Sequence, residues 1–243
     1  METMTTSIIL PFLVFFPFLG AVISYIIGRS NKGARDIWCW ILSAVIFIAS
    51  LMLIGKETVY SLRGFCGLGL SFAADGFGVI LAVLTGAIWL ITTIFSKEYM
   101  AAERNRNRYY FFVFLTLGAT MGIFLSADLF TTFIFFEIMS FTSFVLVMHD
   151  EEDFTVRSAK TYLAVAVIGG LVTLMGLFMM YQKAGTLNMT ELTAFMQSRE
   201  NPAEFYAIGV LILFGFAAKA GLFPLHIWLP NAYTVAPAPS SAL

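Results

Sequence analysis

The chain has 243 residues, of which 59% are hydrophobic and only 12% are charged, and its formal net charge is −1. Because soluble domains carry about 25% charged residues, this composition excludes a soluble domain and indicates an all-α polytopic membrane protein. The near-neutral charge argues against a nucleic-acid partner.

Few side chains in the sequence are suited to binding a metal or a cofactor. The two cysteines, Cys39 and Cys66, lie in different regions without metal-ligand spacing, and we expect them to be packed thiols. Together with two isolated histidines they make neither a zinc nor an iron–sulfur site, so we expect no cofactor in this chain. Residues 1–7 lack the basic start of a signal peptide, so we expect the first apolar helix to remain in the mature protein.

The sequence predicts about seven transmembrane helices and the start of an eighth near Thr234. A membrane-spanning helix needs about 20 mainly apolar residues. The seven stretches that meet this need are Ser7–Gly28, Ile37–Gly55, Gly76–Ser96, Tyr109–Ser126, Leu129–Met148, Thr161–Gln182 and Phe205–Ala220.

Polar residues between these stretches indicate caps and one further helix. Asp75 and Asp128 stand directly before apolar stretches, and we expect their side chains to cap the helices that follow. The polar connection Lys183–Glu204 contains Met189–Arg199, which predicts a short amphipathic helix at the surface.

The distribution of basic residues predicts an orientation. The loops after the first, third and fifth helices hold nine Lys and Arg residues, whereas the opposite side holds four. Because cytoplasmic loops carry the excess of Lys and Arg, the N-terminus is expected outside a cell (inner) membrane.

The last apolar stretch contains Lys219, and Pro224 follows five residues later. A helical proline removes one N–H donor and clashes with the carbonyl four residues back, here that of Ala220, so we expect a break at Gly221 and Pro224. A lysine at membrane depth costs roughly 2.5–3.5 kcal/mol. Broken backbone is tolerated there only where it faces protein or a wet cavity, so these features indicate an ion path. The alternative is a lysine paired for packing beside a structural kink.

Glu137 is the only charged residue in Leu129–Met148 and lies near the predicted membrane midplane. Ser140, one turn further on, is expected to hydrogen-bond the carboxylate. Burial disfavours the charged form of a lone carboxylate or lysine, so a contact between Glu137 and Lys219 would support both charges. Moving the two apart would let Lys219 release its proton. The alternative is a static buried ion pair.

Two motifs carry a family resemblance. The runs FFEIMSF and FAAKAGLFPLHIWLPNAYTVAPAPSSAL resemble the antiporter-like, proton-translocating membrane subunits, and AADGFGVIL and HDEEDFTVRSAKTYLAVAVIGG are similar to further parts of them. This family includes large membrane subunits of respiratory complex I, related subunits of membrane-bound hydrogenases and formate hydrogenlyases, and subunits of multisubunit sodium/proton antiporters.

The resemblance implies roles for four residues in proton translocation. Glu137 and Lys219 correspond to the glutamate and the lysine of the family's proton channel. Lys160 matches a basic residue near the sixth helix, or it is an interfacial lysine that extends to the membrane surface. His226 lies in the PLHxWLP run, where it relays protons or, as we favour, satisfies the unwound backbone.

The chain departs from the family in its extent. Family members have about fourteen helices, including two inverted five-helix repeats. This chain resembles the N-terminal helices, over 1–108, and an incomplete first repeat, over 109–243, and no internal repeat is visible. We therefore expect a second chain to dock beside the fifth and seventh helices and to supply the remaining helices, whether the gene is split or the sequence truncated.

The resulting expectation is a half-channel module of a redox-driven ion pump that moves protons, with sodium left open. The chain would be a non-redox subunit of an oxidoreductase complex resembling NADH-quinone oxidoreductase or a membrane-bound hydrogenase. Its partners would be other membrane subunits, peripheral redox subunits and the lipid membrane. The alternatives are a haem- or quinone-binding membrane subunit that uses His149 and His226, and a purely structural membrane anchor.

Overall fold

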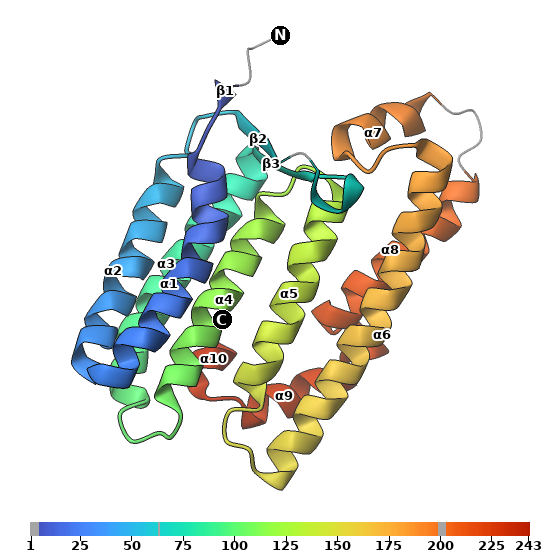
Figure 1. The fold of residues 1–243 in the computed structure, drawn as a ribbon. Helices are drawn as coiled ribbons and strands as arrows, with labels where there is room; N and C mark the ends of the chain where they lie inside the picture. Colours follow the sequence, from blue (N-terminus) through green and yellow to red (C-terminus); the bar gives the residue numbers. More distant parts are fainter. Residues whose placement is uncertain (1–4, 63, 199–202) are drawn as a thin grey trace.

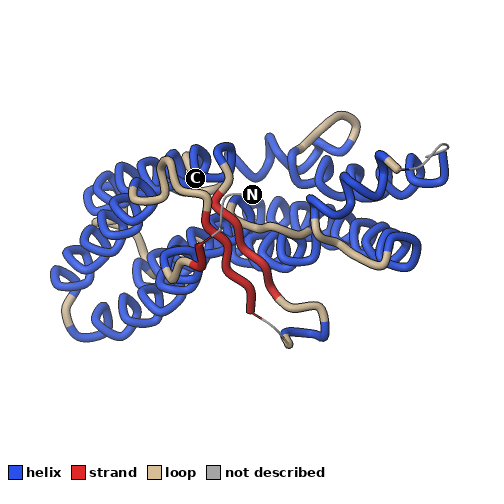
Figure 2. The backbone as a smooth tube through the Cα atoms, turned by 90° about the horizontal axis from the view of Figure 1, so that it is seen from above, coloured by secondary structure: helices blue, strands red, loops and turns tan. Residues whose placement is uncertain are grey.

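The computed structural model describes residues 5–62, 64–198 and 203–243, and it is a bundle of long helices with a small sheet across one end (Figures 1 and 2). The helices are α1 (Ile9–Ser30), α2 (Lys32–Leu51), α3 (Gly76–Tyr99), α4 (Arg106–Phe124), α5 (Leu129–Val147), α6 (Asp153–Ala184), α7 (Met189–Gln197), α8 (Ala203–Ala220), α9 (Trp228–Val235) and α10 (Ala238–Ser241). Two short 3-10 turns, η1 (Phe65–Gly67) and η2 (Leu225–Ile227), complete the helical elements of the described chain.

The predicted membrane-spanning architecture is confirmed. Among the described residues, α1, α2, α3, α5, α6 and the segment Phe205–Val235 are long and apolar enough to cross a membrane. The remaining long helix, α4, begins with two arginines and packs between α1, α3 and α5 (Figure 1). The seven predicted stretches therefore correspond to α1–α6 and α8, and the amphipathic helix corresponds to α7.

Some predicted bounds are wrong for identifiable reasons. Helix α2 starts at Lys32 rather than Ile37, because the Asn31 side chain caps it by accepting from the Ala34 N–H at 3.0 Å. Helix α6 starts at Asp153 rather than Thr161, since an acidic first turn suits the positive end of the helix dipole. The polar start of α6 therefore lies inside the helix.

A three-stranded sheet lies where the sequence indicated only loops. The strands β1 (Thr5–Thr6), β2 (Thr58–Leu62) and β3 (Leu70–Ala74) run in the order β1-β2-β3. Strands β2 and β3 are antiparallel and pair from Thr58 with Ala74 to Leu62 with Leu70. The alternation of buried and half-buried residues in β3 matches a strand packed on one face.

Both predicted aspartate caps are confirmed. The Asp75 carboxylate accepts from the Gly78 N–H at 2.6 Å, at the start of α3. The Asp128 carboxylate accepts from the N–H of Thr131 at 2.7 Å and from its hydroxyl at 2.6 Å, at the start of α5. Cys39 is a buried free thiol, as expected, whereas the side chain of Cys66 lies outside the described residues.

Glycines bring α6 and α8 unusually close together. A Cβ atom added to Gly169 would lie 3.0 Å from the Ala218 Cβ and 3.2 Å from the Gly215 carbonyl oxygen. Gly176, two turns further along α6, similarly faces Ile212 of α8. Small residues at a helix crossing allow such close approach in membrane proteins. This contact fixes the end of α8 against α6, next to α5.

The predicted break after Lys219 is confirmed. Helix α8 ends at Ala220, and Gly221 adopts a left-handed conformation (φ +67°), which a glycine adopts without strain. The chain continues through η2 and α9. The next helix begins later than predicted, because Ala236 precedes Pro237 and is extended, so that α9 ends at Val235 and α10 starts at Ala238.

Candidate functional site

Lys219 lies in the last turn of α8, half-buried, and its ammonium group points to α5 and α6. The Nζ atom donates to the Ser143 Oγ at 3.2 Å and to the hydroxyl of Tyr162. It also lies 4.3 Å from the centre of the Tyr162 ring and 6.0 Å from that of Trp228. Hydroxyl groups and aromatic faces thus surround the cation, and both stabilise an ammonium group away from bulk water.

Tyr162 links the lysine to α5. Its hydroxyl lies 2.6 Å from the Ser143 Oγ and donates to the Ser140 carbonyl at 3.2 Å. The tyrosine is almost fully buried, and its ring packs edge-on against Trp228 at 4.8 Å. The resulting hydrogen-bonded group, formed by Lys219, Tyr162 and Ser143, is called the lysine cluster below.

Trp228 covers the broken backbone. Its indole Nε1 donates to the carbonyl of Ala218 at 2.8 Å, in the last turn of α8. The same carbonyl also accepts from the Gly221 N–H at 3.4 Å, so Trp228 adds a second donor, from α9, at a helix end where carbonyls lack intrahelical partners. The carbonyl end of α8 therefore meets protein, whereas residues 222–224 in the break are exposed in the described chain.

Glu137 lies in the middle of α5, six residues before Ser143, and packs against Gly170 of α6. A Cβ atom on Gly170 would lie 2.8 Å from the Glu137 Cδ and 2.9 Å from Oε2, so the glycine makes room for the carboxylate. The Oε1 atom is buried and has no hydrogen-bond partner among the described residues. The expected bond from Ser140 is wrong, because that hydroxyl donates to the Phe136 carbonyl, four residues back, at 2.9 Å.

Glu137 and Lys219 form no salt bridge in the described part of the chain, although the two charges interact at longer range. The side chains of the lysine cluster hold the ammonium group instead. Ser140 and Ser143 follow Glu137 along α5 at spacings of three and six residues, so polar groups extend from the carboxylate toward the lysine. A direct contact between the two charges stays a prediction.

A cavity of about 450 Å³ opens beside the lysine cluster. Its polar lining comes from Lys219, Tyr162 and Ser143, from Thr116 and Thr120 of α4, and from two serines of α10. One of these serines, Ser240, has a buried hydroxyl without a partner in the described structure. Apolar side chains make up most of the remaining lining, and a cavity of this size has room for several water molecules beside its polar groups.

The structure does not bring the other two predicted residues into this cluster. Lys160 is exposed, two turns from the start of α6, and does not line the cavity. His226 is exposed in η2, where its ring lies 5.6 Å from that of Phe223. Their roles in proton transfer stay predictions.

Sequence reasoning missed Tyr162, Ser143, Trp228 and Gly170. Tyr162 and Gly170 lie eight residues apart on α6, which places both near one helix face, and Ser143 lies six residues after Glu137. This spacing was readable in the sequence. The sequence did not show that these faces of α5 and α6 meet, because the contact depends on how α5, α6 and α8 pack.

The fold and the site define a class: a polytopic membrane subunit with a discontinuous helix that ends at a partly buried lysine beside a cavity. Residues 126–243 match the family model described as "NADH:quinone oxidoreductase/Mrp antiporter, TM". The chain belongs to this family of antiporter-like membrane subunits.

Relatives of this chain include named antiporter subunits. The chain is 31% identical over 247 residues to a Na(+)/H(+) antiporter subunit of Bacillus subtilis (strain 168), covering 99% of this chain and 49% of the relative. It is 32% identical over 175 residues to the Na(+)/H(+) antiporter subunit of the same name from Alkalihalophilus pseudofirmus, covering 72% of this chain and 36% of the relative. The chain therefore spans about half or less of the length of these relatives.

Two solved structures share the fold. A chain of the membrane-bound sulfane sulfur reductase, an archaeal respiratory membrane complex, superposes with a TM-score of 0.87 at 23% identity, over 97% of this chain and 49% of that one. A chain of the Mrp complex from Dietzia sp. DQ12-45-1b gives a TM-score of 0.83 at 26% identity, over 96% and 26%.

Proposed function

We propose that this chain is an ion-translocating module of a multisubunit membrane complex, with protons as one of the ions moved. The family and the two named antiporter relatives support cation and proton translocation. The observation that carries the proposal is the lysine cluster at the end of a broken helix, where it lines a cavity.

The mechanism that we propose uses Lys219 as the group that takes and releases the proton. Its ammonium group is held by hydroxyls, so a proton leaving Nζ has acceptors in Tyr162, Ser143 or cavity water. Glu137 acts on it through the electric field, because a negative carboxylate nearby favours the ammonium form. Protonating or moving Glu137 would then favour release of the proton from Lys219.

The names of the relatives bear on which energy source drives the proposed ion transport. The two relatives described above, at 31% and 32% identity, are named Na+/H+ antiporter subunits, which favours exchange of cations for protons over the redox-driven pump expected from the sequence. We propose other membrane subunits as partners. We also propose that the N-terminal helices end at residue 108 and the first repeat begins at residue 109. The chain lies in the inner membrane, with its N-terminus outside.

The test is transport by the intact complex that contains this chain, reconstituted into vesicles with a pH-sensitive dye inside. An imposed Na+ gradient without an electron donor should drive proton movement. Lys219→Ala should reduce this flux to that of empty vesicles while the complex stays assembled. Glu137→Gln should reduce it more than Glu137→Asp, which keeps the charge. A Lys219→Ala complex that is assembled and transports at the wild-type rate would sink the proposal.

A further inference from the structure

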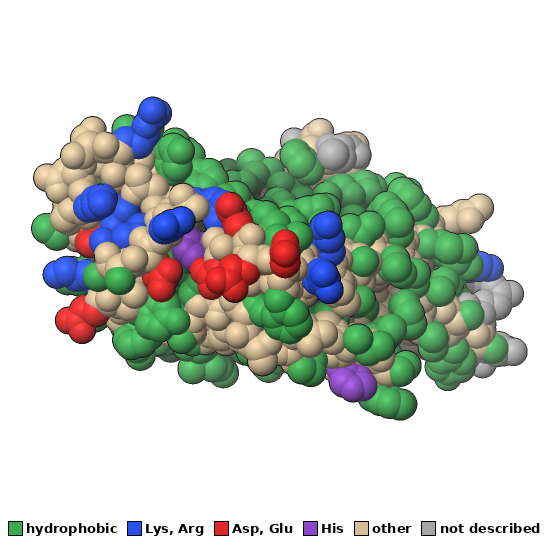
Figure 3. Space-filling model, turned by 90° about the horizontal axis from the view of Figure 1, so that it is seen from below, with side chains coloured by type: hydrophobic (Ala, Val, Ile, Leu, Met, Phe, Trp, Pro, Cys, Tyr) green, Lys and Arg blue, Asp and Glu red, His purple; other side chains and the backbone are tan. Residues whose placement is uncertain are grey.

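A second cavity, of about 880 Å³, lies at the start of α4, where α1, α2 and the α3–α4 loop meet. Five cationic side chains line it, and Glu103 is the one carboxylate among its lining residues. The five are Lys32, Arg35, Arg104, Arg106 and Arg108. We call this cavity the basic pocket. Figure 3 shows Lys and Arg side chains gathered at this end of the molecule, over the side where α1–α4 lie.

Some of this positive charge is neutralised within the protein. Arg35 and Arg106 both bond to Asp36, at 2.7 and 3.3 Å, and Arg108 pairs with Glu151. Arg35 is fully buried and also donates to the Asn107 side chain at 2.5 Å. These bonds fix the wall of the pocket that is formed by α2 and α4.

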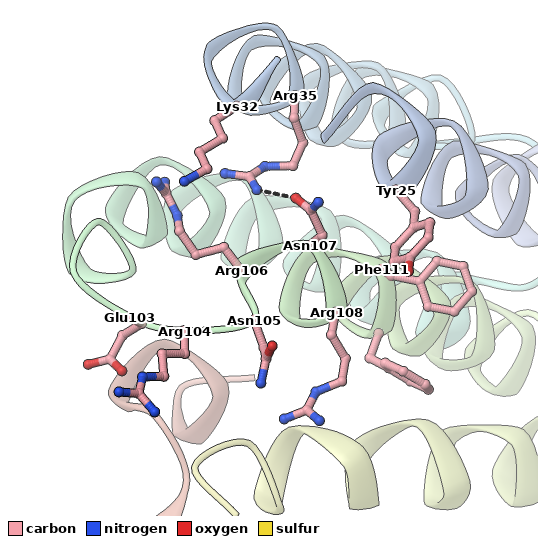
Figure 4. A pocket seen from close by; sticks show the side chains of 11 residues that line it. Tyr25, Lys32, Arg35, Glu103, Arg104, Asn105, Arg106, Asn107, Arg108 and Phe111 are labelled. Carbon is pink, nitrogen blue, oxygen red and sulfur yellow. Dashed lines mark hydrogen bonds between the residues drawn. The ribbon is translucent and has the colours of Figure 1, made fainter. Parts of the chain in front are cut away.

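Other donors of the pocket have no acceptor in the described residues. Lys32 and Arg104 are exposed and form neither a salt bridge nor a side-chain hydrogen bond there. The Nε atoms of Arg106 and Arg108 are buried and also have no partner. In Figure 4, Lys32, Arg35 and Arg106 extend their charged ends into the same part of the pocket. Like charges that converge in this way favour the binding of an anion between them.

The start of α4 adds further donors. The first N–H groups of any helix have no intrahelical acceptor. In this 19-residue helix the N-cap residue, Asn105, is left-handed, and its side chain accepts from none of them. These groups and the positive end of the helix dipole point to the residues that line the pocket. The unpartnered arginine nitrogens and the helix start therefore favour the same ligand, a phosphate group.

An apolar rim distinguishes this pocket from a site for a free ion. Tyr25 and Phe111 pack edge to face at 5.8 Å on one side of the cavity (Figure 4), and the ring of Phe112 packs edge to face against that of Phe111 at 5.2 Å. Tyr25 is 43% exposed, and Val22 and Ile26 on the same helix are more exposed still. These residues belong to the last turns of a membrane-spanning helix, so the pocket lies at the depth of lipid headgroups.

We propose that the basic pocket binds the phosphate of an anionic phospholipid, whose acyl chains lie along Tyr25 and Phe111. Basic pockets between transmembrane helices at the membrane surface bind such headgroups. The bound lipid would tie α1 and α2 to α4. This inference is independent of the proposed ion transport, because it involves neither the lysine cluster nor its cavity.

The experiment is a lipid titration of the purified chain in its complex, in detergent and after removal of bound lipid, followed by native mass spectrometry. The probes are short-chain phosphatidylglycerol, phosphatidylcholine with the same chains, and inorganic phosphate. The test variant is the double substitution Lys32→Gln and Arg104→Gln, which removes two exposed charges. The control is Arg29→Gln with Arg157→Gln, two exposed arginines outside the pocket.

Phosphatidylglycerol should bind the wild type and the control alike, and the test variant should bind it roughly thirtyfold more weakly, given the contribution of each Lys or Arg near an anionic surface. Phosphatidylcholine should bind all three weakly and equally. Equal binding of phosphatidylglycerol by the test variant would overturn the proposal. Displacement of the lipid by millimolar inorganic phosphate would show a site for a free anion. Loss of a co-purifying subunit with lipid binding intact would show a protein interface instead.

Discussion

At the scale of single residues, Tyr162 connects the charge of α8 to the backbone of α5. Its hydroxyl bonds to Lys219, to the Ser143 Oγ and to the Ser140 carbonyl, while its ring lies under the ammonium group. The ring position depends on packing and the three bonds depend on the hydroxyl. A substitution that keeps one and removes the other separates the two contributions.

Tyr162→Phe should slow proton transport at least about fivefold, because the proton on Lys219 loses a hydrogen-bond acceptor, and should cost about 1 kcal/mol of stability. Transport in vesicles and thermal unfolding of the same preparation measure the two effects. Ser143→Ala, which leaves the tyrosine in place, should have a smaller effect on transport. A Tyr162→Phe protein with unchanged transport would show that the hydroxyl only holds α5 and α6 together.

At the scale of elements, the contact between α5 and α6 determines where Glu137 lies. Gly170 leaves the space that the carboxylate occupies. The sequence predicted Glu137, Lys219 and the break at Gly221 and Pro224, since each departs locally from an apolar helix. It did not predict the site's other residues, because they act across helices and a helix pattern alone does not pair its neighbours.

Gly170→Ala should displace the Glu137 carboxylate and reduce transport about tenfold or more, while overpacking costs about 1–3 kcal/mol. Gly209→Ala in α8 is the matched control, because a Cβ atom there would meet nothing within 4 Å. Flux assays and thermal unfolding of both variants provide the comparison. Similar transport by the two variants would contradict the role given to this contact.

The sheet shows another limit of sequence reading at this scale. Strand β3 is bounded by Gly69 and by the Asp75 cap, but its five residues are apolar except for Ser71. Short apolar runs do not distinguish strands from helices by periodicity. The pairing with β2 decides the conformation, and it joins residues that are up to 16 positions apart, such as Thr58 and Ala74.

At the scale of the whole molecule, the end that carries the basic pocket also contains groups that titrate outside the membrane. His149 is buried, its Nε2 lies 3.1 Å from the Arg104 carbonyl, and burial together with the nearby Arg108 lowers its pKa. The Arg108 guanidinium also donates to the His149 carbonyl at 2.7 Å, and its bond to Glu151 lowers the pKa of that carboxyl. The α3–α4 loop, the end of α5 and the start of α6 are thereby linked.

This link predicts a pH dependence of stability. Because the folded protein binds a proton at His149 less readily than the unfolded chain does, stability falls as pH decreases below the ordinary value of 6.5 toward the lowered pKa. The depressed pKa of Glu151 acts in the same direction, at pH below 4.5. Thermal unfolding between pH 8 and 5 should show a declining Tm, and His149→Gln should flatten the decline. If the Tm of His149→Gln declines with pH at the wild-type slope, the pH dependence comes from other groups.

Trp228 gives the molecule an internal optical reporter. Its indole ring packs on Tyr162, lies 6.0 Å from the Lys219 ammonium group and bonds to the end of α8. The sequence has four tryptophans, so in a variant with the other three replaced by phenylalanine this chain would contribute tryptophan emission from this position alone. A charge that appears or disappears beside an indole shifts its emission, so the fluorescence of that variant should follow the charge on Lys219 during turnover. The same recording on Lys219→Met should stay flat.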